Sequence, residues 1–182
     1  MSAVPARLRP FRRPVCRALG LLAAIPLAWV PAAGHASAAV LDAQCSGTFA
    51  RTFTQPVTTT TQTVTAVSTD SYSTCLAGFT GTGTTTTTLP LSCLNVTAGP
   101  AETETITWND PARDTSTIAW GKPVIAGQTV VFDGTVTAGL YQGATAVKIT
   151  SGISYIGSVL PCLLGTPISQ TTGLIDSLLI TG

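Results

Sequence analysis

The sequence has little charge and almost no histidine or methionine. Charged residues make up 9% of the 182 residues, against about 25% in ordinary soluble domains. The formal net charge is only +1, which argues against a protein that binds nucleic acid through electrostatic attraction. The one histidine, His35, and the one methionine, Met1, both lie near the N terminus. The rest of the chain therefore has no histidine for a serine–histidine catalytic site or for a histidine-ligated metal.

Long apolar runs are also absent. The run Ala18–Val30 has 13 residues, which is fewer than the roughly 20 that a transmembrane helix needs. It follows an arginine-rich segment and precedes the small residues of 33–38, an order typical of a secretory signal peptide. We therefore predict a signal peptide over residues 1–38, one secreted domain over residues 39–182, and no transmembrane anchor.

The predicted mature domain contains four cysteines: Cys45, Cys75, Cys93 and Cys162. An even number in an exported domain is typical of two disulfides formed outside the cytoplasm. The chain lacks the C-x-x-C spacing of zinc sites, so we expect no metal and no other cofactor. Three pairings are possible. We predict Cys75–Cys93, which would close a local loop, and Cys45–Cys162, which would join the two ends of the domain. Each would stabilise the fold by roughly 3–5 kcal/mol.

The distribution of threonine predicts a β-fold. Threonine accounts for 33 residues and often alternates with apolar residues, as in strands with one buried face. Pro161 limits the one helix-like segment, 158–164, to a short turn. Segments that recur every 10–15 residues predict an all-β, antiparallel β-sandwich, immunoglobulin-like in general architecture, with about eight or nine strands. The predicted strands are 45–54, 60–67, 72–76, 82–93, 102–108, 115–120, 128–137, 144–150 and 174–181.

Five stretches of the mature region resemble a group of small, threonine-rich, four-cysteine secreted proteins of actinobacteria. The resemblance implies a secreted, disulfide-bonded, all-β domain. The group has no assigned activity, so the resemblance implies no functional residue. The enediyne-antibiotic carrier proteins are similar in class only, because their disulfides are short-range. The stretches are CSGTF at 45–49, TITWND at 105–110, DTSTIAW at 114–120, VVFDGTVTAGLYQGATA at 130–146 and LPCLLG at 160–165.

Trp108 and Trp120 are the candidate ligand-binding residues. They end two predicted strands that the turn 109–111 joins into a hairpin. If both rings were exposed, they would form a platform for stacking against sugar rings. Alternation favours the other interpretation, in which both tryptophans pack in the core. Ile106 and Ile118 share their faces, and threonines occupy the opposite ones.

Few other residues suggest catalysis. Glu102 and Glu104 would lie about 7 Å apart on one strand face, a separation found in glycoside hydrolases. We favour an exposed strand face for this pair. Lys122 or Lys148 could serve a serine–lysine dyad, but no motif places a serine beside either lysine. We therefore predict no catalytic residue and expect that the protein is not an enzyme.

Three weaker patterns remain. Asp110 and Asp114 could contribute to a calcium site, although a turn already explains both residues. Asn95–Thr97 fits the N-glycosylation pattern. T-x-T recurs at several places, including 103–107 and 115–117. Such arrays can bind ice or crystalline polysaccharide, but their irregular spacing along the chain favours an ordinary solvated threonine face.

These observations predict a secreted, extracellular, non-enzymatic and monomeric protein. Its expected role is an extracellular or cell-surface-associated binding or structural module, with cell-wall or extracellular polysaccharide as the partner. The first alternative is a carrier that holds a small apolar ligand between the sheets, and the second is a glycan-active enzyme. Exposed tryptophans would favour the binding module, and a wide apolar cavity would favour the carrier. A cleft that brings Glu102 or Asp110 to another carboxylate would favour the enzyme.

Overall fold

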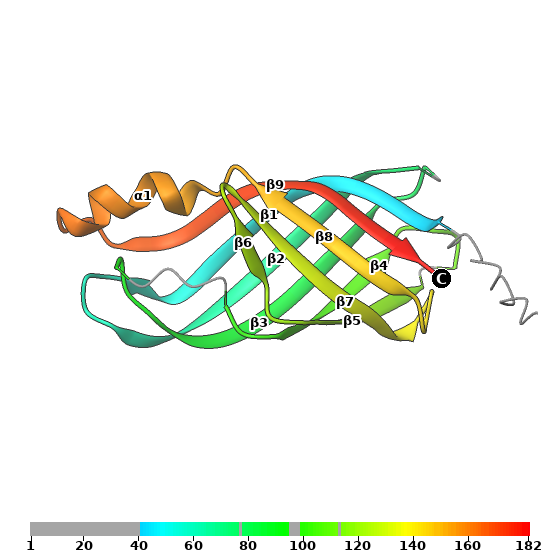
Figure 1. Ribbon diagram of the computed structural model, residues 1–182, viewed down its shortest axis with the longest axis horizontal. Helices are drawn as coiled ribbons and strands as arrows, with labels where there is room; N and C mark the ends of the chain where they lie inside the picture. The colour runs from blue at the N-terminus through cyan, green and yellow to red at the C-terminus, as the bar shows by residue number, and fades with distance from the viewer. Residues whose placement is uncertain (1–40, 77, 95–98, 113) are drawn as a thin grey trace, which may run out of the picture. The chain divides into compact units, whose positions relative to one another are not determined.

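The computed structural model describes residues 41–76, 78–94, 99–112 and 114–182 (Figure 1). The predicted signal peptide and the Asn95–Thr97 pattern lie outside these ranges. Within them, no helix is long and apolar enough to cross a membrane.

Eight of the nine strands in this part of the chain close into an antiparallel barrel. They follow one another in the order β5-β4-β3-β2-β1-β9-β8-β7, and β5 also pairs with β7. The short strand β6 pairs with β7 beside this ring. The all-β class and the number of strands are confirmed, but the pairing of β5 with β7 makes a closed barrel instead of the predicted sandwich. The elements are β1 (Leu41–Val57), β2 (Gln62–Cys75), β3 (Gly81–Leu91), β4 (Glu102–Trp108), β5 (Thr115–Trp120), β6 (Val124–Ala126), β7 (Thr129–Gly139), β8 (Thr145–Ser151), α1 (Ser154–Leu163) and β9 (Ile168–Thr181).

Three local predictions differ from the structure. The segments 60–67 and 72–76 belong to one continuous strand, β2, and the short strand β6 was not predicted. Helix α1 has ten residues, although a single turn was expected. Pro161 lies only two residues before the end of α1, so its missing N–H removes a hydrogen bond from the last turn and leaves the earlier turns intact.

Alternation along the strands separates a polar outer wall from the barrel interior. In β3 the threonines 82, 84, 86 and 88 are exposed, and the residues between them are buried. Neighbouring strands align these exposed threonines in rows, since Thr84 pairs with Thr69 on one side and with Thr105 on the other. Thr105 pairs in turn with Thr117. The spacing that is irregular along the chain is thus regular across the strands, although the rows follow the curved wall of a barrel.

Glycines on the inner wall make room for the largest side chains. A Cβ atom at Gly81 would lie 2.7 Å from the ring of Trp108, and one at Gly134 would lie 2.6 Å from the ring of Trp120. A Cβ atom at Gly83 would overlap the carboxylate of Glu104. These three glycines therefore leave the space that the side chains of Trp108, Trp120 and Glu104 occupy.

The buried apolar residues form two clusters. We call the first the tryptophan cluster. It includes Tyr72, Ile106, Trp108, Ile118 and Trp120, together with Cys45 and Cys75. The second, the helix-end cluster, consists of Val57, Val64, Ala66, Leu89, Leu91, Cys93, Cys162 and Ile168, with Ile153 and Val159 packed against it.

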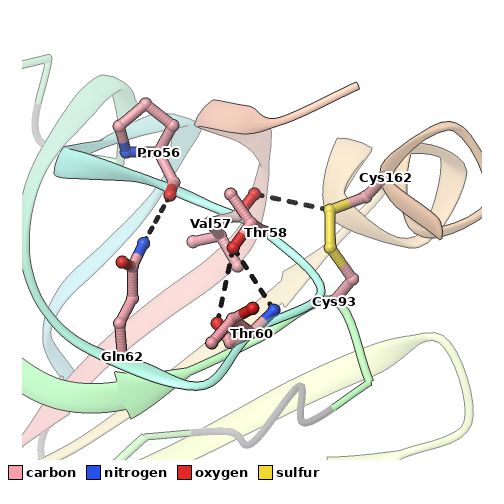
Figure 2. The surroundings of a disulfide bond; sticks show 7 residues. All are labelled: Pro56, Val57, Thr58, Thr60, Gln62, Cys93 and Cys162. Carbon is pink, nitrogen blue, oxygen red and sulfur yellow. Dashed lines mark hydrogen bonds between the residues drawn. A yellow bond between two sulfur atoms is a disulfide. The ribbon is translucent and has the colours of Figure 1, made fainter. Parts of the chain in front are cut away.

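Each cluster contains one disulfide, and both predicted pairings are wrong. The bonds are Cys45–Cys75 and Cys93–Cys162. Cys45 lies directly opposite Cys75 in the ladder between β1 and β2, a register that the spacing of cysteines along the chain does not reveal. Cys93–Cys162 connects the segment after β3 to α1, and Cys162 Sγ lies 3.4 Å from the carbonyl oxygen of Val57 (Figure 2).

Candidate functional site

The two predicted ligand-binding tryptophans are core residues. Trp108 is 1% exposed and Trp120 is 2% exposed. The indole N–H of Trp108 donates to Ser116 Oγ at 2.8 Å, and that of Trp120 donates to Glu104 Oε2 at 2.7 Å. An exposed sugar-stacking platform made of these rings is therefore wrong, and the core-packing interpretation is confirmed.

A chamber of about 150 Å³ lies between the two apolar clusters. It has lining residues from both, such as Phe132 from the tryptophan cluster and Leu89 from the helix-end cluster. Two exposed residues, Ile125 of β6 and Gln128 of the turn that follows β6, also line the chamber and mark its opening to the surface. The other lining residues are Phe49, Arg51, Phe53, Ala66, Ser68, Asp70, Leu91, Glu102, Gly127, Thr129, Val130, Lys148, Thr150, Ile153 and Thr171.

A cluster of buried, ion-paired side chains lies in the wall of this chamber. Lys148 of β8 donates to Asp70 Oδ2 of β2 at 2.7 Å and to Glu104 Oε2 of β4 at 2.8 Å. Tyr72 donates to Glu104 Oε1 at 2.7 Å, and Ser68 donates to Asp70 Oδ1 at 3.1 Å. We call Asp70, Tyr72, Glu104 and Lys148 the charged network. It joins three strands across the barrel, so it fixes their relative positions as well as its own charges.

Aromatic rings surround the ammonium group of Lys148. Its Nζ lies 5.0 Å from the ring centroid of Trp120 and 5.0 Å from that of Phe132. The negative faces of such rings attract a cation. The lysine is thus held by two carboxylates and two rings, although it is only 3% exposed.

Burial and neighbouring charges shift three pKa values in the network. Burial raises the pKa of Glu104, which Lys148 lowers and Asp70 raises, and the net shift is upward. Burial lowers the pKa of Lys148, but the carboxylates of Glu104 and Asp70 raise it by more. Burial raises the pKa of Tyr72 well above its ordinary value, and Glu104 and Asp70 raise it further. Lys148 and Tyr72 therefore keep their protons at neutral pH.

A second, looser ion pair lies at the chamber. Arg51 Nη2 of β1 is 3.6 Å from Glu102 Oε2 of β4, and Thr87 Oγ1 donates to the same oxygen at 2.8 Å. Arg51 Nε is buried, and no acceptor in the described part of the chain lies within hydrogen-bonding distance of it. Arg51 therefore has a buried donor without a hydrogen-bond partner within the described ranges, whereas the side chains of the charged network are hydrogen-bonded to one another.

The remaining candidate residues have separate positions. Glu102 and Glu104 do share one face, as predicted, but that face is the barrel interior and not an exposed edge. Asp110 Oδ1 accepts a hydrogen bond from the Asp114 N–H at 3.1 Å, which supports the turn interpretation of this pair. Lys122 is exposed. Among the described residues, no group of three or more His, Cys, Asp or Glu could hold a metal ion.

Sequence reasoning missed the charged network, although a signal for it was present. Glu104 has the same strand parity as Ile106 and Trp108, and Asp70 has the same parity as Tyr72. Parity alone therefore places these carboxylates inside. The sequence analysis nevertheless predicts exposed carboxylates, because buried charges are rare unless they are paired and the pairing partner, Lys148, is far away in sequence.

No family model, no curated protein and no solved structure matches this chain. The resemblance to small actinobacterial proteins therefore stays a prediction.

Proposed function

We propose that the mature protein is a secreted, non-enzymatic carrier that holds one small, mainly apolar ligand inside the barrel. The chamber is the observation that carries this proposal. Its wall combines three phenylalanine rings with a few fixed polar groups, a composition common in small-molecule sites. A carrier is favoured over the polysaccharide-binding module, since both tryptophans expected to form the sugar platform are buried.

The volume of the chamber limits the size of the ligand. Pockets for drug-sized molecules usually have about 300–1,000 Å³. An apolar cavity of about 150 Å³ in another protein accommodates benzene. A single-ring molecule therefore matches this chamber, and a long acyl chain or an oligosaccharide does not.

Titration of the oxidised mature domain with ethylbenzene, observed by NMR, would test the proposal. We expect saturable shifts at residues that line the chamber. Ala66→Leu would add three carbon atoms to the chamber wall and should abolish them. Ala119→Leu makes the same change on the exposed face of β5 and should leave binding intact. If wild-type protein shows no saturable shift, or if Ala66→Leu binds as the wild type does, the chamber is not a ligand site.

A second candidate function is acid–base catalysis in the same chamber. The observation that favours it is that two carboxylic residues, Glu102 and Asp70, both line the chamber, as the glycan-active alternative requires. Hydrolysis of a single-ring methyl glycoside by the wild type, lost in both Glu102→Gln and Asp70→Asn, would support it. Absence of turnover by correctly folded wild-type protein would leave the carrier as the better proposal.

A further inference from the structure

The polar groups at the chamber differ in how completely they are satisfied. Asp70 accepts hydrogen bonds from Ser68 and Lys148, and Lys148 also donates to Glu104. A ligand that displaced any of these contacts would leave a buried charge without its partner, which is costly. The charged network is therefore a fixed part of the wall and is unsuited to recognising a ligand by exchange of partners.

Arg51 is the exception at this wall. The distance of 3.6 Å between Arg51 Nη2 and Glu102 Oε2 is too long for a good hydrogen bond. Thr87 already donates to this carboxylate oxygen. The Nε–H of Arg51 is buried and finds no acceptor among the described residues. Buried donors normally have a partner, and one without a partner requires an explanation. A ligand atom with a lone pair would supply the missing acceptor.

The charges around the chamber restrict the kind of acceptor. The wall and the layer behind it contain three acidic residues and two basic ones. The acidic residues are Asp70, Glu102 and Glu104, and the basic ones are Arg51 and Lys148. An anionic ligand would face this excess of carboxylates in an environment where charges are weakly screened. A cationic ligand has only donors at its charged group and could not satisfy Arg51 Nε. A neutral acceptor meets both conditions.

We infer that the chamber binds a small, neutral carbonyl compound with a compact apolar body, such as an aromatic ketone, aldehyde or ester. This inference rests on the proposed carrier function. Arg51 Nε donates to the carbonyl oxygen. Phe49 and Phe53 lie two residues to either side of Arg51 along β1, and both of them line the chamber together with Phe132 of β7. These three rings supply the apolar contacts for the body of the ligand.

Four ligands that share one benzene ring test this inference on the wild-type protein alone. They are acetophenone, ethylbenzene, benzoate and benzylamine, and their dissociation constants can be measured by NMR titration at neutral pH. A hydrogen bond from a charged donor typically changes affinity by tenfold or more. We expect acetophenone to bind about tenfold more tightly than ethylbenzene, and benzoate and benzylamine to bind more weakly than either.

Arg51→Lys tests the role of Nε directly. The lysine keeps a positive charge beside Glu102 but has no group equivalent to Nε–H. We expect this variant to bind acetophenone and ethylbenzene equally, with ethylbenzene affinity unchanged from the wild type. Circular dichroism and ethylbenzene binding together establish that the variant is folded.

The outcomes separate the inference from the proposed function. If ethylbenzene binds as tightly as acetophenone, or if benzoate or benzylamine binds best, the inference is wrong and the carrier function stands. If Arg51→Lys keeps the full preference for acetophenone, Arg51 is not the donor and the inference is again wrong. If none of the four ligands binds saturably, the carrier function itself fails.

Discussion

The two ends of the barrel interior are both apolar but are filled differently. At one end the tryptophan cluster packs Trp108, Ile106 and Ile118 with almost no exposure. At the other end the side chains of the helix-end cluster do not fill the interior, and the chamber lies beside Leu89 and Leu91. Each end has a disulfide, so covalent bonding does not account for the difference. Side-chain volume does, because the large rings of the tryptophan cluster fit against glycines on neighbouring strands.

The charged network forms a boundary between these two ends. Glu104 contacts Trp120 and Tyr72 of the tryptophan cluster, and Lys148 reaches from it to Asp70 at the chamber. Buried polar networks that are fully satisfied can hold a core in one arrangement. We therefore expect the network to stop the tryptophan cluster from relaxing into the chamber.

Replacement of Lys148 by methionine should have the largest effect on stability. Methionine has similar length, but it leaves Asp70 and Glu104 close together without their shared cation. Loss of one partner of a buried ion pair typically costs about 3–5 kcal/mol. The free energy of unfolding, measured by urea denaturation, should fall by this amount. Lys122→Met at an exposed position should change it by less than about 0.5 kcal/mol, and equal effects of the two variants would contradict a structural role for the network.

Removal of the disulfide at the open end should be almost as costly. The double variant Cys93→Ser/Cys162→Ser frees a bond that spans 69 residues, for which loop entropy predicts a loss of about 4 kcal/mol. Hydrogen exchange should rise first in α1, since this bond connects α1 to the segment after β3 (Figure 2). Uniformly faster exchange across the barrel, with no preference for α1, would show that the bond does not secure the open end in particular.

The same truncation at the two ends should have unequal effects. Ile106 is fully buried in the tryptophan cluster, and Ile106→Ala should cost about 3 kcal/mol because it creates a cavity. Ile153 is partly exposed and lines the chamber, so Ile153→Ala should cost about 1 kcal/mol. Thermal and urea unfolding of both variants would measure the difference. Similar losses would mean that the two ends are packed alike.

Alkaline pH should weaken the boundary gradually. The pKa values of Tyr72 and Lys148 are raised in the folded protein, whereas in the unfolded chain they are about 10 and 10.4. Above about pH 10 the unfolded chain therefore loses protons that the folded chain retains. Its stability falls with rising pH, by up to about 1.4 kcal/mol per pH unit for each group.

Urea denaturation at a series of pH values between 8 and 11.5 (roughly the range in which both groups titrate in the unfolded chain) would measure this slope. Tyr72→Phe should reduce it, because the phenyl ring has no proton to lose. A stability that stays constant up to the highest pH, or a slope that Tyr72→Phe leaves unchanged, would contradict the prediction.

The sequence predicted the local features of this fold well. Alternation in 102–108 and 115–120 correctly predicted a hairpin with Ile106, Trp108, Ile118 and Trp120 facing inward. These features depend on neighbours in sequence and on the turn between the strands. Closure of the barrel depends on the pairing of β5 with β7, and no local pattern distinguishes that pairing from the edges of a sandwich.

The candidate site was less predictable for a related reason. Asp70, Glu104 and Lys148 are 34 and 44 residues apart along the chain, and only the closed barrel brings them into contact. Strand parity places Asp70 and Glu104 inside, but no local pattern shows that Lys148 pairs with them. The predicted disulfide pairings are wrong for the same reason, since Cys45 and Cys75 meet through a register that is set by the whole of β1 and β2.

The placement of the basic residues has a consequence for resistance to proteases. Trypsin-like proteases cleave after lysine or arginine, and they need that part of the backbone to be accessible. In the described part of the predicted mature domain, Arg51 and Lys148 face the barrel interior, and the exposed Lys122 is followed by Pro123, which fixes the backbone and removes an N–H. Cutting at Arg51 or Lys148 therefore requires the barrel to open first, so the rate of digestion at these positions reports on how often the strands separate.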